Sequence, residues 1–126
     1  MNDRGEKVTI GGKEYELLLT TRATKEIAKK YGGMEKLGDK ILQSKNYSEA
    51  LEEIIWLITL LANQPIAIRN YRNPADRVPP LSEEEVELMT TPAELADYRD
   101  AITAALLKGT KRDIESEVTL KNARNG

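Results

Sequence analysis

The chain contains no cysteine, no histidine and no phenylalanine, and it has a single tryptophan. The absence of cysteine excludes disulfides and thiolate chemistry, and the absence of histidine removes the usual proton-transfer group near neutral pH. A structural zinc site is not expected either, because such sites are built from cysteine and histidine ligands. We therefore expect no metal and no cofactor. The core should consist mainly of leucine, isoleucine, alanine, valine and some of the five tyrosines.

A strong charge imbalance is also missing, since 19 basic and 21 acidic residues leave a net charge of −2. A charge so close to zero gives no long-range attraction to nucleic acid. Residues 1–9 lack the apolar segment of a signal peptide. The apolar run from Ile54 to Ala62 is far shorter than the roughly 20 residues that cross a bilayer. Together with the absence of cysteine, this predicts a soluble, intracellular protein without membrane association.

The first residues of the chain alternate between apolar and polar side chains around a glycine pair. Residues 8–10 precede Gly11-Gly12, and residues 15–17 continue the alternation after it. Two glycines supply the positive φ angles of a two-residue turn. The pattern therefore predicts a β-hairpin over residues 7–19. Because a lone hairpin is marginally stable in water, it must rest on helices or join another sheet.

Helix signals dominate the rest of the chain. A first helix is expected over residues 21–31, capped by Thr20 or Thr21 and stopped by the glycine pair that follows it. A short second helix is expected over residues 34–42. Their inward-facing residues should be Ala23, Ile27 and Tyr31 in the first helix, and Met34, Leu37 and Ile41 in the second.

A third helix, capped by Asn46 or Ser48, contains the apolar run. A helix that is apolar nearly all round is buried on most of its sides. Pro65 lacks a backbone donor, so it should kink or end this helix, with a further turn or two reaching about Tyr71. The main apolar stripe of the helix consists of Leu51, Ile54, Ile55, Ile58, Leu61 and Ala62.

A proline-rich loop and two helix starts follow. Residues 70–80 hold three prolines and are expected to form an exposed loop. The sequences SEEE at residues 82–85 and TPAE at residues 91–94 each predict a capping box, in which the first and last side chains bond each other's backbone amides. One face of the last helix should carry Leu95, Tyr98, Ile102 and Leu106.

The last helix is expected to end near Lys108, with Gly109 just beyond it. Residues 111–126 are mostly polar without a clear period, and they should form a partly disordered tail. The fold class predicted from these elements is α+β and predominantly α-helical. Residues 1–110 should form a single domain, in which the N-terminal hairpin is followed by a small bundle of four to six helices.

No set of residues arranged for catalysis is apparent. The glycine pairs at 11–12 and 32–33 do not form a phosphate loop, because neither leads a strand into a helix with the required lysine. The glutamates at 83–85 and 52–53 are explained by their places near helix starts, where negative charge suits the helix dipole. We therefore predict no catalytic residues, no enzymatic activity and no small-molecule substrate.

A basic cluster lies beside the proline-rich loop, with Arg69, Arg72 and Arg77 close in sequence to Tyr71. Such a cluster could contact a phosphate backbone. The net charge favours the alternative, a solvated turn beside the loop. Nucleic acid is therefore not an expected partner, and a small nucleic-acid-binding regulator is the weaker functional alternative.

The long apolar helix has two interpretations that do not exclude each other. In the first it is the central core helix of a small bundle. In the second, one of its flanks forms a surface that mates with a partner or with a second copy of the chain. The candidate partner-binding residues lie off the main stripe or beyond Pro65, and they are Trp56, Leu57, Leu60, Ile66 and Ile68.

Three segments in this order resemble a known family. They are VTIGGKEYELLLTTRATKEIAKKYGG at residues 8–33, EALEEIIWLITLLANQ at residues 49–64, and SEEEVELMTTPAELADYRDAITAALLKG at residues 82–109. Their layout resembles that of the tail assembly chaperones of long-tailed phages and prophages of Gram-positive bacteria. The resemblance spans about residues 7–110 and rests on the order of the segments and on the general pattern of residue types within them.

The resemblance implies a small helical protein without a catalytic site. Such chaperones coat the long apolar tape-measure protein in the host cytoplasm, help recruit tail-tube subunits, and are absent from the mature virion. Shielding the apolar helices of another chain requires complementary apolar surface, and covering a long client by repetition could involve self-association. The main alternative is a phage structural or adaptor protein that stays in the particle.

The resemblance also raises the hypothesis of a second gene product. In many of these phages a −1 ribosomal frameshift near the end of the chaperone gene yields a longer protein. Leu120-Lys121-Asn122 can be encoded by TTA AAA AAC, which contains the slippery sequence A AAA AAC. Codons that forbid slippage at this position would remove the support for a longer form.

Overall fold

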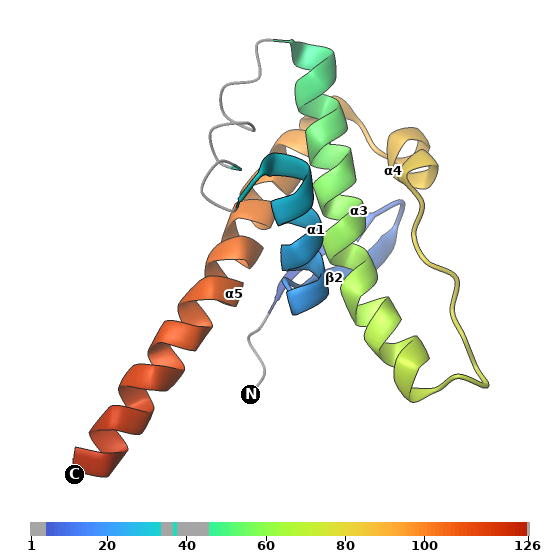
Figure 1. Ribbon diagram of the computed structural model, residues 1–126. Coiled ribbons are helices and arrows are strands. Elements are labelled where there is room, and N and C mark those ends of the chain that lie inside the picture. The colour runs from blue at the N-terminus through green and yellow to red at the C-terminus, as the bar shows by residue number, and fades with distance from the viewer. Residues whose placement is uncertain (1–4, 34–36, 38–45, 126) are drawn as a thin grey trace.

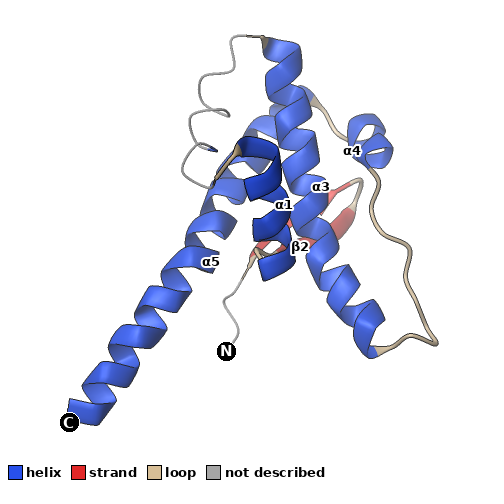
Figure 2. Cartoon of the chain, viewed as in Figure 1, coloured by secondary structure: helices blue, strands red, loops and turns tan. Residues whose placement is uncertain are grey.

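The computed structural model describes residues 5–33, residue 37 and residues 46–125. Within these residues a two-stranded hairpin and four helices form a predominantly helical α+β fold, which confirms the predicted fold class (Figures 1 and 2). The elements in chain order are β1 (Glu6–Ile10), β2 (Lys13–Leu17), α1 (Thr21–Tyr31), α3 (Tyr47–Arg72), α4 (Glu83–Met89) and α5 (Pro92–Asn125).

The hairpin closes through the predicted glycine turn. Ile10 pairs with Lys13 in an antiparallel ladder, and Gly11 and Gly12 between them have φ angles of 58° and 83°. Two consecutive positive φ angles define the turn type that matches the twist of a hairpin. The turn also packs on α4, since a Cβ added at Gly11 would lie 3.1 Å from the Cβ of Met89.

The structure selects one residue from each pair of candidate helix caps. The Thr20 hydroxyl accepts the N–H of Ala23 at 3.0 Å, and α1 stops at Gly32 in the left-handed conformation. The Asn46 side chain accepts the N–H of Ser48 at 2.8 Å and caps α3. Each cap satisfies a backbone donor that has no partner inside its helix.

Both predicted capping boxes are present. Glu85 donates its N–H to the Ser82 hydroxyl at 3.1 Å, and its carboxylate accepts the N–H of Ser82 at 3.4 Å. Thr91 and Glu94 make the same reciprocal pair, at 3.4 Å and 3.0 Å. Two adjacent boxes therefore fix where α4 and α5 begin.

The core is centred on α3, which packs against β2, α1, α4 and α5 (Figure 1). The predicted stripe of α3 is buried, except that Leu51 is half-buried. Burying a large aliphatic side chain stabilises the fold by about 1.5–3 kcal/mol. Leu37 is buried as expected, whereas the rest of the predicted helix over 34–42 lies outside the described residues. Fully buried core residues include Leu17 of β2, Ile27 of α1, Ile58 and Leu61 of α3, and Ile102 of α5.

By length and composition alone, α3 could also cross a membrane, with a mean hydropathy of 1.3 over its most apolar window. Within the fold, 44% of that window is buried. The buried residues face β2 and the other helices. Packing inside the protein therefore accounts for part of the apolar character of the helix.

Pro65 does not end α3, which is continuous from Tyr47 to Arg72. A proline at this position cannot donate to the carbonyl of Leu61, four residues earlier. The backbone N–H of Leu18, just after β2, donates to that carbonyl at 3.2 Å instead. The helix thus continues through the proline because another segment of the chain supplies the missing donor.

The predicted end of the last helix near Lys108 is wrong, because α5 continues through Gly109 to Asn125. A Cβ added at Gly109 would lie 2.7 Å from the Cβ of Leu19. Gly109 therefore permits close packing of α5 against the chain that leaves β2, which is a different role from stopping a helix. The C-terminal part of α5 extends away from the hairpin and α3 (Figure 1).

Candidate partner-binding surface

The structure divides the five predicted partner-binding residues into three groups. Leu57 has an exposed fraction of 0%, so the prediction that it lies at the surface is wrong. It is buried because α3 is enclosed from several sides, and a position off the main stripe still faces a neighbouring element. Trp56 and Leu60 are half-buried and pack against the core. Ile66 and Ile68 are half-buried in the part of α3 beyond Pro65.

Trp56 belongs to a cluster that joins α1 to α3. Tyr31 meets the Trp56 ring edge-on, with 6.1 Å between ring centroids, and the Lys30 ammonium lies 4.8 Å from the centroid of Trp56. The Tyr31 hydroxyl donates to the Glu53 carboxylate. Burial and this hydrogen bond to Glu53 together raise the pKa of the Tyr31 hydroxyl above its ordinary value. Trp56 is therefore engaged within the protein by a cation and an aromatic ring.

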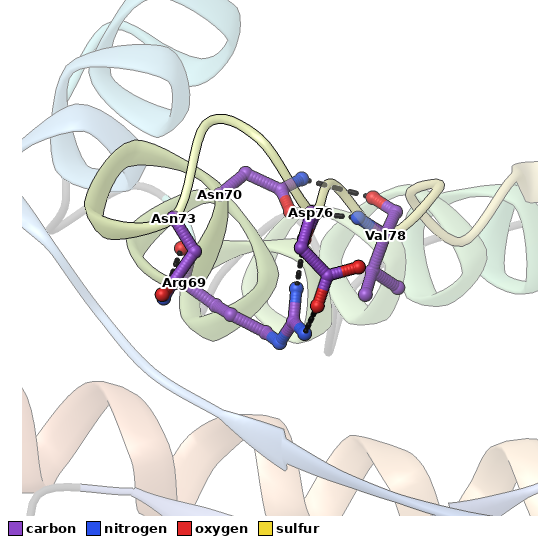
Figure 3. Close-up of polar contacts among 5 residues, drawn as sticks. All are labelled: Arg69, Asn70, Asn73, Asp76 and Val78. Carbon is purple, nitrogen blue, oxygen red and sulfur yellow. Dashed lines mark hydrogen bonds and ion pairs between the residues drawn. The ribbon is translucent and has the colours of Figure 1, made fainter.

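The chain between α3 and α4 is fastened to α3 by two asparagines. Asn70 accepts the N–H of Val78 at 2.8 Å and donates to its carbonyl at 2.9 Å (Figure 3). Asn63 makes the same pair of bonds with Leu81, at 2.7 Å and 2.8 Å. The two asparagines are seven residues apart and therefore lie on one face of the helix. We call residues 77–81 the strap.

Arg69 also holds this connection. Its guanidinium donates to the backbone carbonyl of Asp76 at 2.7 Å and forms an ion pair with the Asp76 carboxylate at 3.0 Å (Figure 3). Arg72, Arg77 and Tyr71 are exposed. One of the three arginines of the predicted basic cluster is thus paired with a carboxylate, which weakens the cluster as a phosphate-binding site.

Two grooves flank Pro65. The first has a volume of about 530 Å³ and lies between the end of β2 and the last turns of α3. Its apolar lining is Leu18, Pro65, Ala67, Ile68 and Tyr71, and its charged lining is Glu16, Arg22 and Arg72. The second has a volume of about 470 Å³ and lies between β2 and the strap, with Pro65, Ile66, Val78 and Pro79 among its apolar lining residues. The predicted residues Ile66 and Ile68 therefore occupy one groove each.

Sequence reasoning missed the residues that complete these grooves. Leu18 and Tyr71 line the first groove, and the prolines of the strap line the second. Tyr71 was noticed only as part of the basic cluster, although its exposed fraction of 87% is the largest among the exposed large apolar residues. Tyr71 lies one helical turn beyond Ile68, and a tyrosine beside an apolar residue near the end of a core helix is a signal that could have identified it as part of a binding surface.

The described residues show no sign of a metal centre. In that part of the chain no group of three or more acidic side chains is placed to hold a metal ion. Nor does any buried side-chain nitrogen or oxygen there lack a hydrogen-bond partner. What the described surface offers is apolar grooves with charged rims, an arrangement typical of protein–protein interfaces.

Comparisons of the chain with protein-family models, curated proteins and solved structures find no match.

Proposed function

We propose that this protein is a tail assembly chaperone of a long-tailed phage or prophage. In this role it binds the tape-measure protein and helps recruit tail-tube subunits during tail morphogenesis. The observation that carries the proposal is the first of the two grooves beside Pro65, the one whose apolar lining includes Ile68. Together with the order of hairpin, apolar helix and capped C-terminal helices, it supplies what a protein that shields apolar helices requires.

The first groove suits an apolar client helix. Its lining residues Ala67, Ile68 and Tyr71 belong to the last turns of α3, and Leu18 belongs to the chain that leaves β2. An amphipathic helix binds such a groove through its apolar face. The charged residues Arg22 and Arg72 at the same groove can pair with polar residues on the sides of a client helix.

The proposed role needs no chemistry, so we expect no enzymatic activity and no cofactor. The protein would act in the cytoplasm of the host and be left out of the finished particle. Repetition along a tape-measure protein would cover a client much longer than one chaperone, and self-association of the chaperone would favour such repetition.

The experiment that tests the proposal is co-expression of the tagged protein with the tape-measure protein of its own tail gene cluster. We expect the two proteins to co-purify, and the tape-measure protein to precipitate without the chaperone. Peptide mass spectrometry of purified particles separates the alternative role, because a structural or adaptor protein would be found in them. Failure to co-purify, together with presence in particles, would replace the proposal with that alternative.

A further inference from the structure

The register of the hairpin determines which backbone groups of β2 face outward. In an antiparallel ladder, hydrogen-bonded pairs alternate with non-hydrogen-bonded pairs, and the residues that flank a two-residue turn form a hydrogen-bonded pair. Ile10 and Lys13 flank this turn. Counting from them, Glu14 and Glu16 belong to non-hydrogen-bonded pairs, so their N–H and C=O groups point away from β1.

Two observed bonds agree with this alternation. Leu18 is the next residue in the outward series of β2, and its N–H reaches the carbonyl of Leu61 in α3. Thr9, in the outward series of β1, accepts a hydrogen bond from the Tyr98 hydroxyl at 2.5 Å. Within the described part of the chain, no protein group pairs with the outward backbone groups of Glu14 and Glu16. The edge of β2 is therefore closed at Leu18 and open nearer the turn.

The open edge faces a slot. The second groove has β2 on one side and the strap on the other, with Pro65 and Ile66 of α3 also lining it. Asn63 and Asn70 hold the strap against α3. The strap cannot itself pair fully with β2, because its two prolines have no backbone N–H. An extended segment in this slot would find the unpaired groups of the β2 edge along one side.

The charges of the slot indicate what kind of segment it accepts. Glu14 and Glu16 are two residues apart and lie on the same face of the hairpin. Glu85 of α4 lines the same groove, and Lys13 is the one basic residue that lines it. Lys7 lies 3.9 Å from Glu14, but both side chains are largely exposed, so Glu14 can exchange this weak ion pair for one with a docked segment at little cost in free energy.

A second copy of the chain fits the edge poorly. Antiparallel pairing of two β2 edges in the register centred on Tyr15 would place Glu14 and Glu16 of one copy against the same glutamates of the other. Like charges opposite each other destabilise a strand pair. A strand that carries lysine or arginine at alternate positions would place opposite charges there instead.

We propose that the outer edge of β2 is a docking site for an extended, basic segment of another protein. The segment adds to β2 as a third strand, hydrogen-bonds to the backbone of Glu14 and Glu16, and directs alternate lysine or arginine side chains toward the two carboxylates. The backbone bonds supply affinity and the carboxylates supply selectivity. This inference concerns the second groove, and it does not depend on the identity of the apolar client proposed for the first.

The test uses a displayed library of random linear peptides, each about 10 residues long, which is the length of a long strand. The library is selected on the full-length protein. We expect enriched peptides with basic residues at alternate positions, and we expect them to shift the amide resonances of Glu14 and Glu16. Enrichment of no peptide, or of peptides without that alternation, would overturn the proposal.

The variant Glu16→Pro makes the test specific. Proline at this position removes an outward N–H and leaves the ladder to β1 intact, as at edge positions generally. Lys7→Pro is the matched control, because Lys7 pairs with Glu16 in the ladder and its N–H points outward at the opposite edge. We expect the selected peptides to lose about tenfold or more in affinity for Glu16→Pro, and to bind Lys7→Pro at least as tightly as the wild type, because that variant also removes a lysine near Glu14. Equal binding to both variants would overturn the proposal.

Two further measurements keep the result unambiguous. If Glu16→Pro does not fold, the double variant Glu14→Lys, Glu16→Lys keeps the edge amides, and it should shift the enriched peptides from basic to acidic sequences. Analytical ultracentrifugation of the wild-type protein tests whether a second copy of the chain occupies the β2 edge instead. A dimer that the double variant weakens would show that a second copy fills the edge, against the proposal.

Discussion

Leu18 donates its backbone N–H to the carbonyl of Leu61 at 3.2 Å, and this carbonyl is the acceptor that Pro65 leaves without its usual donor inside α3. This hydrogen bond therefore joins the end of the hairpin to the central helix at the carbonyl that lacks its usual helical donor. Leu18 and Pro65 both line the first groove. The residue that removes a helical donor from α3 therefore also lines the candidate binding surface.

Pro65→Ala tests this relationship. Alanine restores an N–H that competes with Leu18 for the Leu61 carbonyl, so the helix should gain a hydrogen bond while the hairpin loses one of its bonds to α3. We expect faster hydrogen exchange at the Leu18 amide with little loss of overall helicity. Pro92→Ala is the control, because a proline in the first turn of α5 interrupts no helical bond. Unchanged protection at Leu18 would mean that the carbonyl accepts both donors.

Because of the Tyr31 hydroxyl, the free energy of unfolding should decrease as the pH rises into the alkaline range. Burial and the hydrogen bond to Glu53 raise its pKa in the folded state above the value of about 10 in an unfolded chain. The neutral hydroxyl is therefore favoured by folding, and its contribution is complete below about pH 10 and lost as the pH rises further. Tyr31→Phe should flatten this decline in urea unfolding measured between about pH 8 and about pH 11.

The control for this variant is Tyr71→Phe, which changes an exposed tyrosine on the same chain. Stability should still decline somewhat at alkaline pH in Tyr31→Phe, because the pKa of Tyr98 is raised as well. The main cause is burial of the Tyr98 hydroxyl, and the nearby carboxylates of Glu94 and Asp97 add to it. At neutral pH we expect Tyr31→Phe to lose about 1 kcal/mol from the missing hydrogen bond. A decline identical to that of the wild type would contradict the role assigned to Tyr31.

Asn63→Ala should release the strap. The substitution leaves both the N–H and the carbonyl of Leu81 without their side-chain partner, which costs about 1–3 kcal/mol when such groups stay buried. We expect a lower free energy of unfolding and faster proteolysis within the strap. Asn73→Ala is the control, because Asn73 is exposed and its side chain makes one bond, to the carbonyl of Arg69. Equal proteolysis of the two variants would show that Asn63 does not hold the strap.

Gly109→Ala sets helix propensity against packing. In an open helix the change would stabilise by about 1 kcal/mol. Here the new methyl group would lie 2.7 Å from Leu19, and overpacking of this kind costs about 1–3 kcal/mol. We expect net destabilisation in thermal unfolding, and we expect Leu19→Ala to reduce it only in part in the double variant, because alanine removes the contacting Cγ and Cδ2 atoms but keeps the Cβ. A more stable Gly109→Ala protein would show that Leu19 moves aside without cost.

The sequence was sufficient wherever structure is determined by neighbouring residues. The glycine turn, the capping of α1 by one of two candidate threonines and the two capping boxes depend on a few consecutive residues, and all were predicted. The buried stripe of α3 followed from helical periodicity in the same way.

The errors arose where a distant segment decides the outcome. Pro65 was expected to kink or end α3, but the helix does not end there, and Leu18 supplies the missing donor. Gly109 was expected to end α5, but it accommodates Leu19 within the helix. Leu57 was expected at the surface, but α3 is enclosed on more sides than an amphipathic pattern can indicate. The grooves could not be predicted for the same reason, because they form only when the hairpin and the strap pack beside α3.

The most direct test of the proposed function compares two tyrosine variants of α3 for binding to the tape-measure protein. Tyr71 is 87% exposed and lines the first groove, whereas Tyr47 is 69% exposed at the opposite end of the same helix. Neither substitution by aspartate should disturb folding, which circular dichroism would verify. We predict that wild type and Tyr47→Asp retain equal amounts of tape-measure protein, and that Tyr71→Asp retains about tenfold less. No complex with the wild type, or equal retention by Tyr71→Asp, would contradict the account.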